Sequence, residues 1–157
     1  MEICSVNPAN RKQINEFISS QWYSTDMVIR GEVVDLTTVD GFAVFDAEDL
    51  IGLITYRIME DECEITSFDS LRENQGIGTS LLNKVKEEAV KQNCKKVKLI
   101  TTNDNINALR YYQKRGFDMV HLYPNALDIS RQLKPTIPMS GDFGIPLKHE
   151  IEFEIIL

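Results

Sequence analysis

The sequence is poor in cysteine and histidine, and this shortage argues against two kinds of small-protein scaffold. Its three cysteines, Cys4, Cys63 and Cys94, lie far apart in a chain of 157 residues. An odd number of cysteines without close spacing favours reduced thiols over a disulfide framework. The two histidines, His121 and His149, belong to no metal-ligand pattern, so the sequence predicts no metal site.

Basic residues are also scarce. The chain has 17 Lys and Arg residues against 24 Asp and Glu residues, which gives a formal net charge of -7. Because no basic stripe is available to replace phosphate counterions, we expect no general binding of nucleic acid. An acidic surface favours cationic partners such as amines, or it serves solubility alone.

Long apolar runs are absent as well. The first residues, MEICSVNPANRKQ, contain no apolar core of signal-peptide length, and no segment approaches the length of a membrane span. We therefore expect a cytoplasmic protein without a membrane partner. The length and the 43% hydrophobic composition predict a single domain, residues 1–157, with a sizeable core.

Alternating and amphipathic patterns predict a layered arrangement of strands and helices. The predicted elements are a strand over 2–6, a helix from Asn7 to about Trp22, a strand hairpin over 41–58, a strand over 62–68, a helix starting at 76, a strand over 95–102, a helix over 105–115, a strand over 117–123 and a strand over 149–157. Residues 23–40 show no clear pattern. This order predicts an α/β (α+β) domain with helices packed on a mixed sheet. The helical connection that starts at residue 76 is long enough to make the strands on its two sides parallel.

Two further features are expected near the C-terminus. Residues 124–147 are predicted to form a loop in which NALDISRQLKP is a helical lid. Arg131 and Lys134 of this lid either bind a substrate carboxylate or are simply solvated. In the last strand apolar residues alternate with glutamates, which predicts one buried face and one exposed face. The buried face would hold Ile151, Phe153, Ile155 and Leu157, and the exposed face Glu150, Glu152 and Glu154.

Two glycines stand at the start of the helix that is predicted from residue 76, although glycine costs about 1 kcal/mol in a helix. The sequence Gly76-Ile77-Gly78 after a strand and a short loop suits an anion site. The N–H groups of a first helical turn lack partners, and the helix dipole is positive there. Alternatively, the glycines only allow a turn and close packing. A Rossmann fingerprint would need glycine where Leu81 stands, and a P-loop would need Gly-Lys-Ser/Thr, which the chain lacks.

A second motif follows about thirty residues later, in NINALRYYQKRGF, residues 105–117. It has the pattern N-x-x-A-x-x-x-Y-x-x-x-G-F. Together with the glycine loop, this motif resembles the GNAT superfamily of acyl-CoA-dependent N-acetyltransferases over residues 50–123. The resemblance implies a single domain with a mixed, mostly antiparallel sheet of six to seven strands. It also implies a splayed central parallel pair of strands and about four flanking helices.

The resemblance implies acetyl-CoA as cosubstrate and assigns residues to it. The pyrophosphate would lie on the loop and helix start that match Gln75, Gly76, Ile77, Gly78 and Thr79. The first position of the family motif, usually Gln or Arg, is Glu73 here, so Arg72 or Gln75 is expected to substitute for it. The backbone near Phe68 would donate to the thioester carbonyl as an oxyanion hole, and that near Leu99 and Thr101 would flank the pantetheine arm.

Two side chains of the second motif gain roles from the resemblance. Asn105 would contact the pantetheine, and Tyr112 would protonate the leaving thiolate. The two residues lie seven positions apart and therefore share a helix face. The alternative is that Asn105 caps the helix and Tyr112 packs in the core. Tyr111 lies 100° further round the same helix.

A base must take a proton from the amine, because a typical alkylammonium group has a pKa near 10. The candidates on the strand over 62–68 are Glu62 and Glu64, which share a face with Thr66 and Phe68 unless a bulge intervenes. The alternative for both glutamates is that of ordinary solvated charges. Asp69, His121 and Tyr123 are further candidates.

The predicted activity is transfer of an acetyl group from acetyl-CoA to a primary amine by direct attack in a ternary complex. No cysteine is placed to form an acetyl-enzyme. The acceptor, a small-molecule or peptide amine, would lie between the N-terminal segment and the loop of residues 124–147. A catalytically silent acyl-CoA-binding module and a nucleotide-binding signalling protein are the alternatives, and a homodimer is left open.

Overall fold

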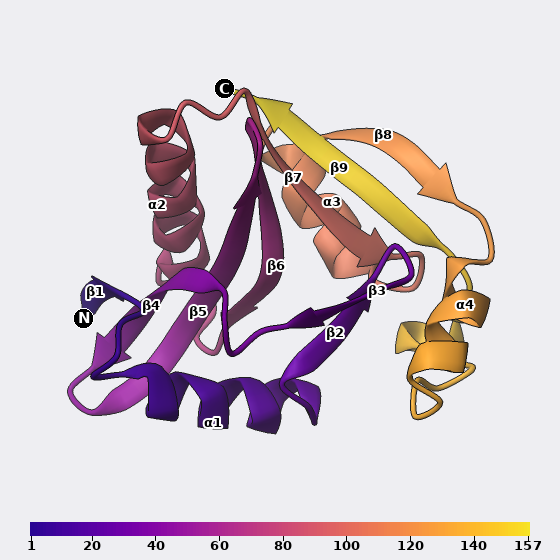
Figure 1. Cartoon of the computed structure of the whole chain (residues 1–157), viewed down its shortest axis with the longest axis horizontal. Helices are drawn as coiled ribbons and strands as arrows, with labels where there is room; N and C mark the ends of the chain where they lie inside the picture. Colours follow the sequence, from indigo (N-terminus) through magenta and orange to yellow (C-terminus); the bar gives the residue numbers. More distant parts are fainter. The chain divides into compact units, whose positions relative to one another are not determined.

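Four α-helices and nine β-strands make up the fold, which a computed structural model describes for all residues, 1–157 (Figure 1). In chain order the elements are β1 (Glu2–Ser5), α1 (Arg11–Trp22), β2 (Asp26–Ile29), β3 (Glu32–Asp35), β4 (Asp40–Asp46), β5 (Asp49–Met59), β6 (Glu62–Ser70), α2 (Ile77–Lys91), β7 (Lys96–Thr102), α3 (Ile106–Lys114), β8 (Asp118–Tyr123), α4 (Ala126–Leu133), the short 3-10 turn η1 (Asp142–Gly144) and β9 (Glu150–Ile156). No helix combines the length and apolar character that crossing a bilayer requires.

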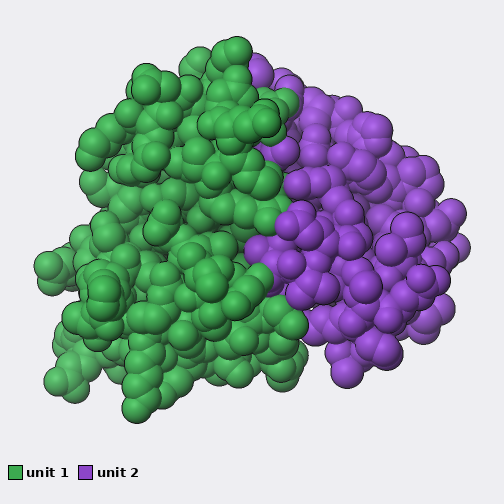
Figure 2. All heavy atoms as spheres, viewed as in Figure 1, with its two compact units in different colours: residues 1–26, 35–97, 157 green, residues 27–34, 98–156 purple.

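The chain divides into two compact units, which Figure 2 shows in green and purple. Unit 1 consists of residues 1–26, 35–97 and 157, and unit 2 of residues 27–34 and 98–156. The strand order is β1-β4-β5-β6-β7 in unit 1 and β7-β9-β8 in unit 2. Strand β7 is named in both because it begins in unit 1 and continues in unit 2.

The sheet of unit 1 is antiparallel from β1 to β6. The start of β7 lies beside the start of β6, where the Lys96 ammonium is 3.3 Å from a carboxylate oxygen of Glu62. The backbone N–H of Lys95 also donates to the carbonyl of Asp61 at 2.7 Å. The two strands therefore run parallel, with α2 as their connection. This confirms the predicted mixed, mostly antiparallel sheet of six to seven strands with one parallel pair.

The helices of unit 1 contact opposite faces of β5. On one face Gly52 lets α2 approach, since a Cβ atom there would lie 2.6 Å from Cγ2 of Ile77. On the other face Leu53 pairs with Asp69, and the Asp69 carboxylate accepts a hydrogen bond of 2.9 Å from the indole of Trp22 in α1. The residues that α2 buries are those of its predicted apolar stripe: Ile77, Leu81, Leu82, Val85 and Ala89.

In unit 2 strand β9 lies between β7 and β8. The side chain of Tyr112 on α3 packs on this sheet. The ring of Tyr112 lies 5.8 Å from that of Phe153 on β9. Strand β8 is the edge strand, and its apolar residues Met119, Val120 and Leu122 are exposed.

Three expectations need correction, two about unit 2 and one about Leu157, the end of the chain in unit 1. Residues 27–34 are not irregular but carry most of the β2–β3 hairpin, which turns at Arg30 and Gly31 with positive φ angles of 49° and 74°. This hairpin covers the start of β9, where the backbone N–H of Arg30 donates to the Glu150 carboxylate at 3.3 Å. Glu150 is consequently only 2% exposed, so the predicted exposure of this glutamate is wrong. Leu157, which was expected to be buried, is 40% exposed at the chain end.

Candidate active site

The predicted anion site in unit 1 is the uncapped start of α2. Gly76 is the N-cap residue, has a left-handed backbone with φ 73°, and provides no side-chain cap. The first helical hydrogen bond runs from the N–H of Ser80 to the carbonyl of Gly76 at 2.9 Å. The N–H groups of Ile77, Gly78 and Thr79 precede this bond and have no carbonyl one turn earlier. They point out of the positive end of a 15-residue helix, which is the electrostatic setting of an anion site.

The loop before α2 leaves these amides accessible. A Cβ atom added to Gly76 would meet no other atom within 4 Å. Asn74, Gln75 and Thr79 are exposed, and Gly78 is half-buried. Asn74 also has a left-handed backbone, with φ 59°. A phosphate group can therefore approach the helix start without displacing a side chain.

Arg72, which the sequence places beside the pyrophosphate, has a partner in unit 1. Its guanidinium Nη1 lies 2.6 Å from a carboxylate oxygen of Asp46, at the end of β4. The hydrogen bond and charge of Arg72 lower the pKa of the Asp46 carboxyl. Glu73 is exposed, as expected for an acidic side chain at this motif position. The main-chain amides of α2 are thus better placed to bind a diphosphate than either charged side chain.

A β-bulge interrupts β6 at Thr66. Tyr56 of β5 pairs with Ile65, but the next residue of β5, Thr55, pairs with Ser67. Thr66 is therefore the extra residue on β6, and its hydroxyl is 2.8 Å from the hydroxyl of Thr55. Bulges of this kind change the direction of the side chains that follow them.

Simple alternation predicts that Phe68 shares a face with Glu62 and Glu64. This prediction is wrong, because the bulge turns Phe68 to the opposite face. Phe68 pairs with Ile54, on the face of β5 that α2 covers. Asp69 pairs with Leu53 and takes the face of the two glutamates instead. The bulge thereby brings a third carboxylate to the face that contacts α1.

The two glutamates predicted as base candidates each have a basic partner. Glu62 pairs with Lys96 at 3.3 Å. Glu64 is 0% exposed, and one of its carboxylate oxygens accepts from Nη2 of Arg57 at 2.8 Å and from Nε at 3.0 Å. A buried carboxylate needs such a partner, because an unpaired charge there would be very costly. These ion pairs give both glutamates a structural role, and their catalytic role stays a prediction.

In unit 2 the two motif residues of α3 occupy the positions that the structural alternative predicts. The side-chain oxygen of Asn105 accepts from the N–H of Ala108 at 3.2 Å and so caps α3. Tyr112 is buried, and its ring lies 5.5 Å from the ring of Phe117. The cap uses only the side-chain oxygen of Asn105, so its side-chain N–H groups are suited to bind a ligand. Thr101, another predicted cofactor residue, is half-buried on β7.

The neighbouring Tyr111 differs from Tyr112 in its surroundings. The Arg115 guanidinium lies 3.5 Å from the centre of the Tyr111 ring, a cation–π contact one helical turn along α3. Tyr111 is half-buried and stacks against Arg115, at a position 100° round the helix from Tyr112.

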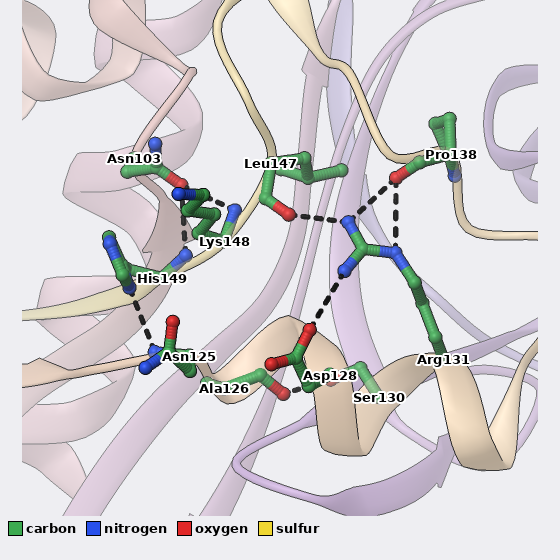
Figure 3. A network of polar contacts seen from close by, with 10 residues as sticks. All are labelled: Asn103, Asn125, Ala126, Asp128, Ser130, Arg131, Pro138, Leu147, Lys148 and His149. Carbon is green, nitrogen blue, oxygen red and sulfur yellow. Dashed lines mark hydrogen bonds and ion pairs between the residues drawn. The ribbon is translucent and has the colours of Figure 1, made fainter.

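Arg131 of α4 is an anchor of the 134–147 loop, because its guanidinium donates to carbonyls of that segment (Figure 3). Its Nη2 donates to the carbonyls of Pro138, at 2.8 Å, and Leu147, and its Nε donates to Pro138 at 3.3 Å. Its Nη1 lies 3.5 Å from Asp128, and the side chain is only 14% exposed. Residues 126–133 form the predicted helix, and Arg131 ties it to the loop that follows.

Two residues after β7 fasten the same loop, and the sequence analysis did not single them out. The side-chain oxygen of Asn103 accepts from the N–H groups of Lys148 and His149, at 3.0 and 2.9 Å. The Asp104 carboxylate accepts from the N–H of Asp142 at 2.9 Å. Asn and Asp favour such side-chain to backbone bonds, but the partners lie about forty residues away. The sequence alone gives no signal for that pairing.

Replacing Arg131 by alanine should loosen the loop. We expect Arg131→Ala to lower the local stability of residues 138–147 by about 1–3 kcal/mol, because two carbonyls lose their donor. Faster amide hydrogen exchange confined to this segment would show it. Lys84→Ala is the control, since its exposed pair with Glu87 at 3.5 Å contributes little. Unchanged exchange at 138–147 would refute the anchoring role.

Comparisons with known proteins agree with this architecture. The acetyltransferase (GNAT) family profile matches residues 11–117. The chain is 41% identical to the uncharacterized protein YdhI of Bacillus subtilis (strain 168) over 158 residues, covering 100% of this chain and 99% of the relative. It is 45% identical to the uncharacterized protein YxbD of that organism over 139 residues, 88% and 87% of the two chains. A GNAT family acetyltransferase from Elizabethkingia anophelis, crystallised with acetyl-CoA bound, has a TM-score of 0.71 at 20% identity and covers 99% of this chain and 97% of its own. The matched glycine loop, the α3 motif and the full-length relatives lead to one conclusion: the chain belongs to the acetyltransferase (GNAT) family.

Proposed function

We propose that the protein transfers an acetyl group from acetyl-CoA to a primary amine, by direct attack of the amine nitrogen in a ternary complex. The observation that carries this proposal is the uncapped, accessible start of α2, where Gly76 leaves the amides of residues 77–79 open to a diphosphate. Family membership and the acetyl-CoA bound to the similar Elizabethkingia anophelis enzyme support this cosubstrate.

Most of the predicted site residues receive a role in this proposal. The amides of Gly76, Ile77, Gly78 and Thr79, assisted by Gln75, bind the pyrophosphate. The N–H of Phe68 donates to the thioester carbonyl and stabilises negative charge as it develops. Thr101 and Asn105 contact the pantetheine arm, and Tyr112 gives a proton to the departing CoA thiolate.

The cysteines support direct attack over a covalent acetyl-enzyme. Cys63 is fully buried, and burial raises its pKa to about 12, so its thiol stays protonated at neutral pH. Burial also raises the pKa of Cys4 and of Cys94. A protonated thiol is a poor nucleophile, so none of the three suits acyl transfer.

An amine screen with the purified protein tests the proposal. Acetyl-CoA would be incubated with polyamines, amino acids, aminoglycosides and peptides with free N-termini, and release of the CoA thiol would be measured. Thiol release that depends on one class of amine would support acetyltransfer. Tight CoA binding without turnover on any amine would favour a silent acyl-CoA-binding module. Thermal protection by ATP or NAD but not by CoA would indicate a nucleotide-binding protein.

A further inference from the structure

We infer that the Asp69 carboxylate takes the proton of the acceptor amine and that Trp22 positions it for this step. The inference rests on the proposed function and adds the residue that the sequence left open, the general base. Two observations support it. The bulge in β6 sets the face on which Asp69 lies, and the carboxylates of Glu62, Glu64 and Asp69 have different partners.

The bulge at Thr66 decides which carboxylate lies near the reacting carbonyl. Without the bulge, Asp69 would lie on the face of β6 that packs on α2. With it, Asp69 lies on the face that contacts α1, where Trp22 donates to it at 2.9 Å. Asp69 directly follows Phe68, the proposed donor to the thioester oxygen, and consecutive Cα atoms are about 3.8 Å apart. The Asp69 side chain is therefore attached to the residue of β6 that directly follows the proposed oxyanion donor.

The partners of the three carboxylates differ in charge. Glu62 has the Lys96 ammonium and Glu64 has the Arg57 guanidinium. Asp69 has the neutral indole N–H of Trp22. A cationic partner favours the ionised carboxylate and so weakens it as a base, whereas a neutral donor has a smaller effect. Of the three, Asp69 is the one suited to hold a proton for part of the reaction.

Its surroundings make Asp69 more basic than an ordinary aspartate. Burial raises the pKa of the Asp69 carboxyl, and the hydrogen bond from Trp22 offsets only part of that effect. Of the charged side chains on α1 and β5, Arg11 binds the Val39 carbonyl at 2.9 Å, Arg57 binds Glu64, and Lys12, Glu16 and Asp49 are exposed. A base whose pKa moves toward the working pH is a better proton acceptor.

The proton balance of the step is complete with Asp69 and Tyr112. Asp69 takes one proton from the ammonium group of the acceptor and later releases it to water. The neutral nitrogen forms its bond to the acetyl carbon as the carbon–sulfur bond breaks. The nitrogen then loses its second proton, which balances the proton that Tyr112 gives to the thiolate and regains from solvent.

Asp69→Asn tests the assignment with little change of shape, because the amide oxygen can still accept from Trp22. We expect kcat/KM for the amine to fall about 100-fold. The rise of activity with pH on the acidic side should also disappear, while the Kd for acetyl-CoA stays within twofold. The melting temperature should not fall. With a raised pKa in the folded state, Asp69 stabilises the protein at low pH, and this contribution is lost as the pH rises through that pKa. Asparagine removes the cost of burying the charge at neutral pH.

Two further variants separate catalysis from structure. Trp22→Phe removes the donor that lowers the pKa of Asp69, so the acidic limb of the pH profile should move to higher pH; a purely structural tryptophan would not move it. Asp49→Asn, an exposed carboxylate on β5, should leave rate and profile unchanged.

The results distinguish failure of this inference from failure of the proposed function. A wild-type rate and profile in Asp69→Asn would overturn the assignment of Asp69 while acetyltransfer stands. A wild-type protein that binds acetyl-CoA but acetylates no amine would overturn the proposed function, and the assignment with it.

Discussion

Gly78→Glu is expected to abolish acetyl-CoA binding without unfolding the protein. The new carboxylate would stand among the amides of residues 77–79, where the diphosphate is proposed to bind. Like charges about 4 Å apart repel by roughly 1–4 kcal/mol, depending on exposure, and the side chain adds bulk as well. We therefore expect the Kd for acetyl-CoA, measured by calorimetry, to rise about 100-fold or more.

The same substitution should not weaken the helix. A negative charge in the first turn of α2 stabilises it by about 0.3–1 kcal/mol, so loss of binding cannot be ascribed to unfolding. Val90→Glu is the matched control, because this residue is exposed near the other end of α2. It adds an equal charge and should change the Kd less than twofold. Retained binding in Gly78→Glu would mean that the glycine loop is not the diphosphate site.

Tyr112→Phe is expected to lower kcat about 100-fold, the effect of removing a general acid. The phenylalanine ring can keep the contacts of the tyrosine ring with Phe117 and Phe153. The melting temperature and the Kd for acetyl-CoA should therefore change little. Steady-state kinetics with a saturating amine would measure the effect.

Tyr111→Phe is the control for this prediction. The substituted ring can still lie against Arg115, and Tyr111 has no role in the proposed reaction. We expect its kcat to remain within twofold of wild type. Equal rates for Tyr112→Phe and the wild-type protein would remove Tyr112 from the mechanism. The buried Tyr112 would then have a structural role in the core only.

The local patterns of the sequence predicted most of the helices and strands. The apolar stripe of α2 was confirmed in full, because a helical period of 3.6 residues is set within the segment itself. The glycine loop was predicted for the same reason, since the need for a bare backbone at a helix start is local. The cap by Asn105 and the burial of Tyr112 follow from positions within one short helix.

The parts that the sequence did not reveal depend on contacts between distant segments. The bulge at Thr66 is a property of the pairing of β6 with β5, and no residue pattern in β6 marks it. The burial of Glu150 depends on a hairpin 120 residues earlier, whose Arg30-Gly31 turn lacks the usual Asn-Gly signal. Charged residues on a strand look alike in a sequence, and only the fold shows that Glu64 has an arginine and Asp69 an indole as partner.

The close approach at Gly52 has a consequence for the energetics of ligand capture. Ile77, the first residue of α2, rests directly on this glycine, with no space for even a methyl group between them. The helix start is thereby held against a central strand, so its amides keep their orientation before any anion arrives. Little reorganisation is then required on binding, and most of the attraction between anion and backbone can appear as affinity.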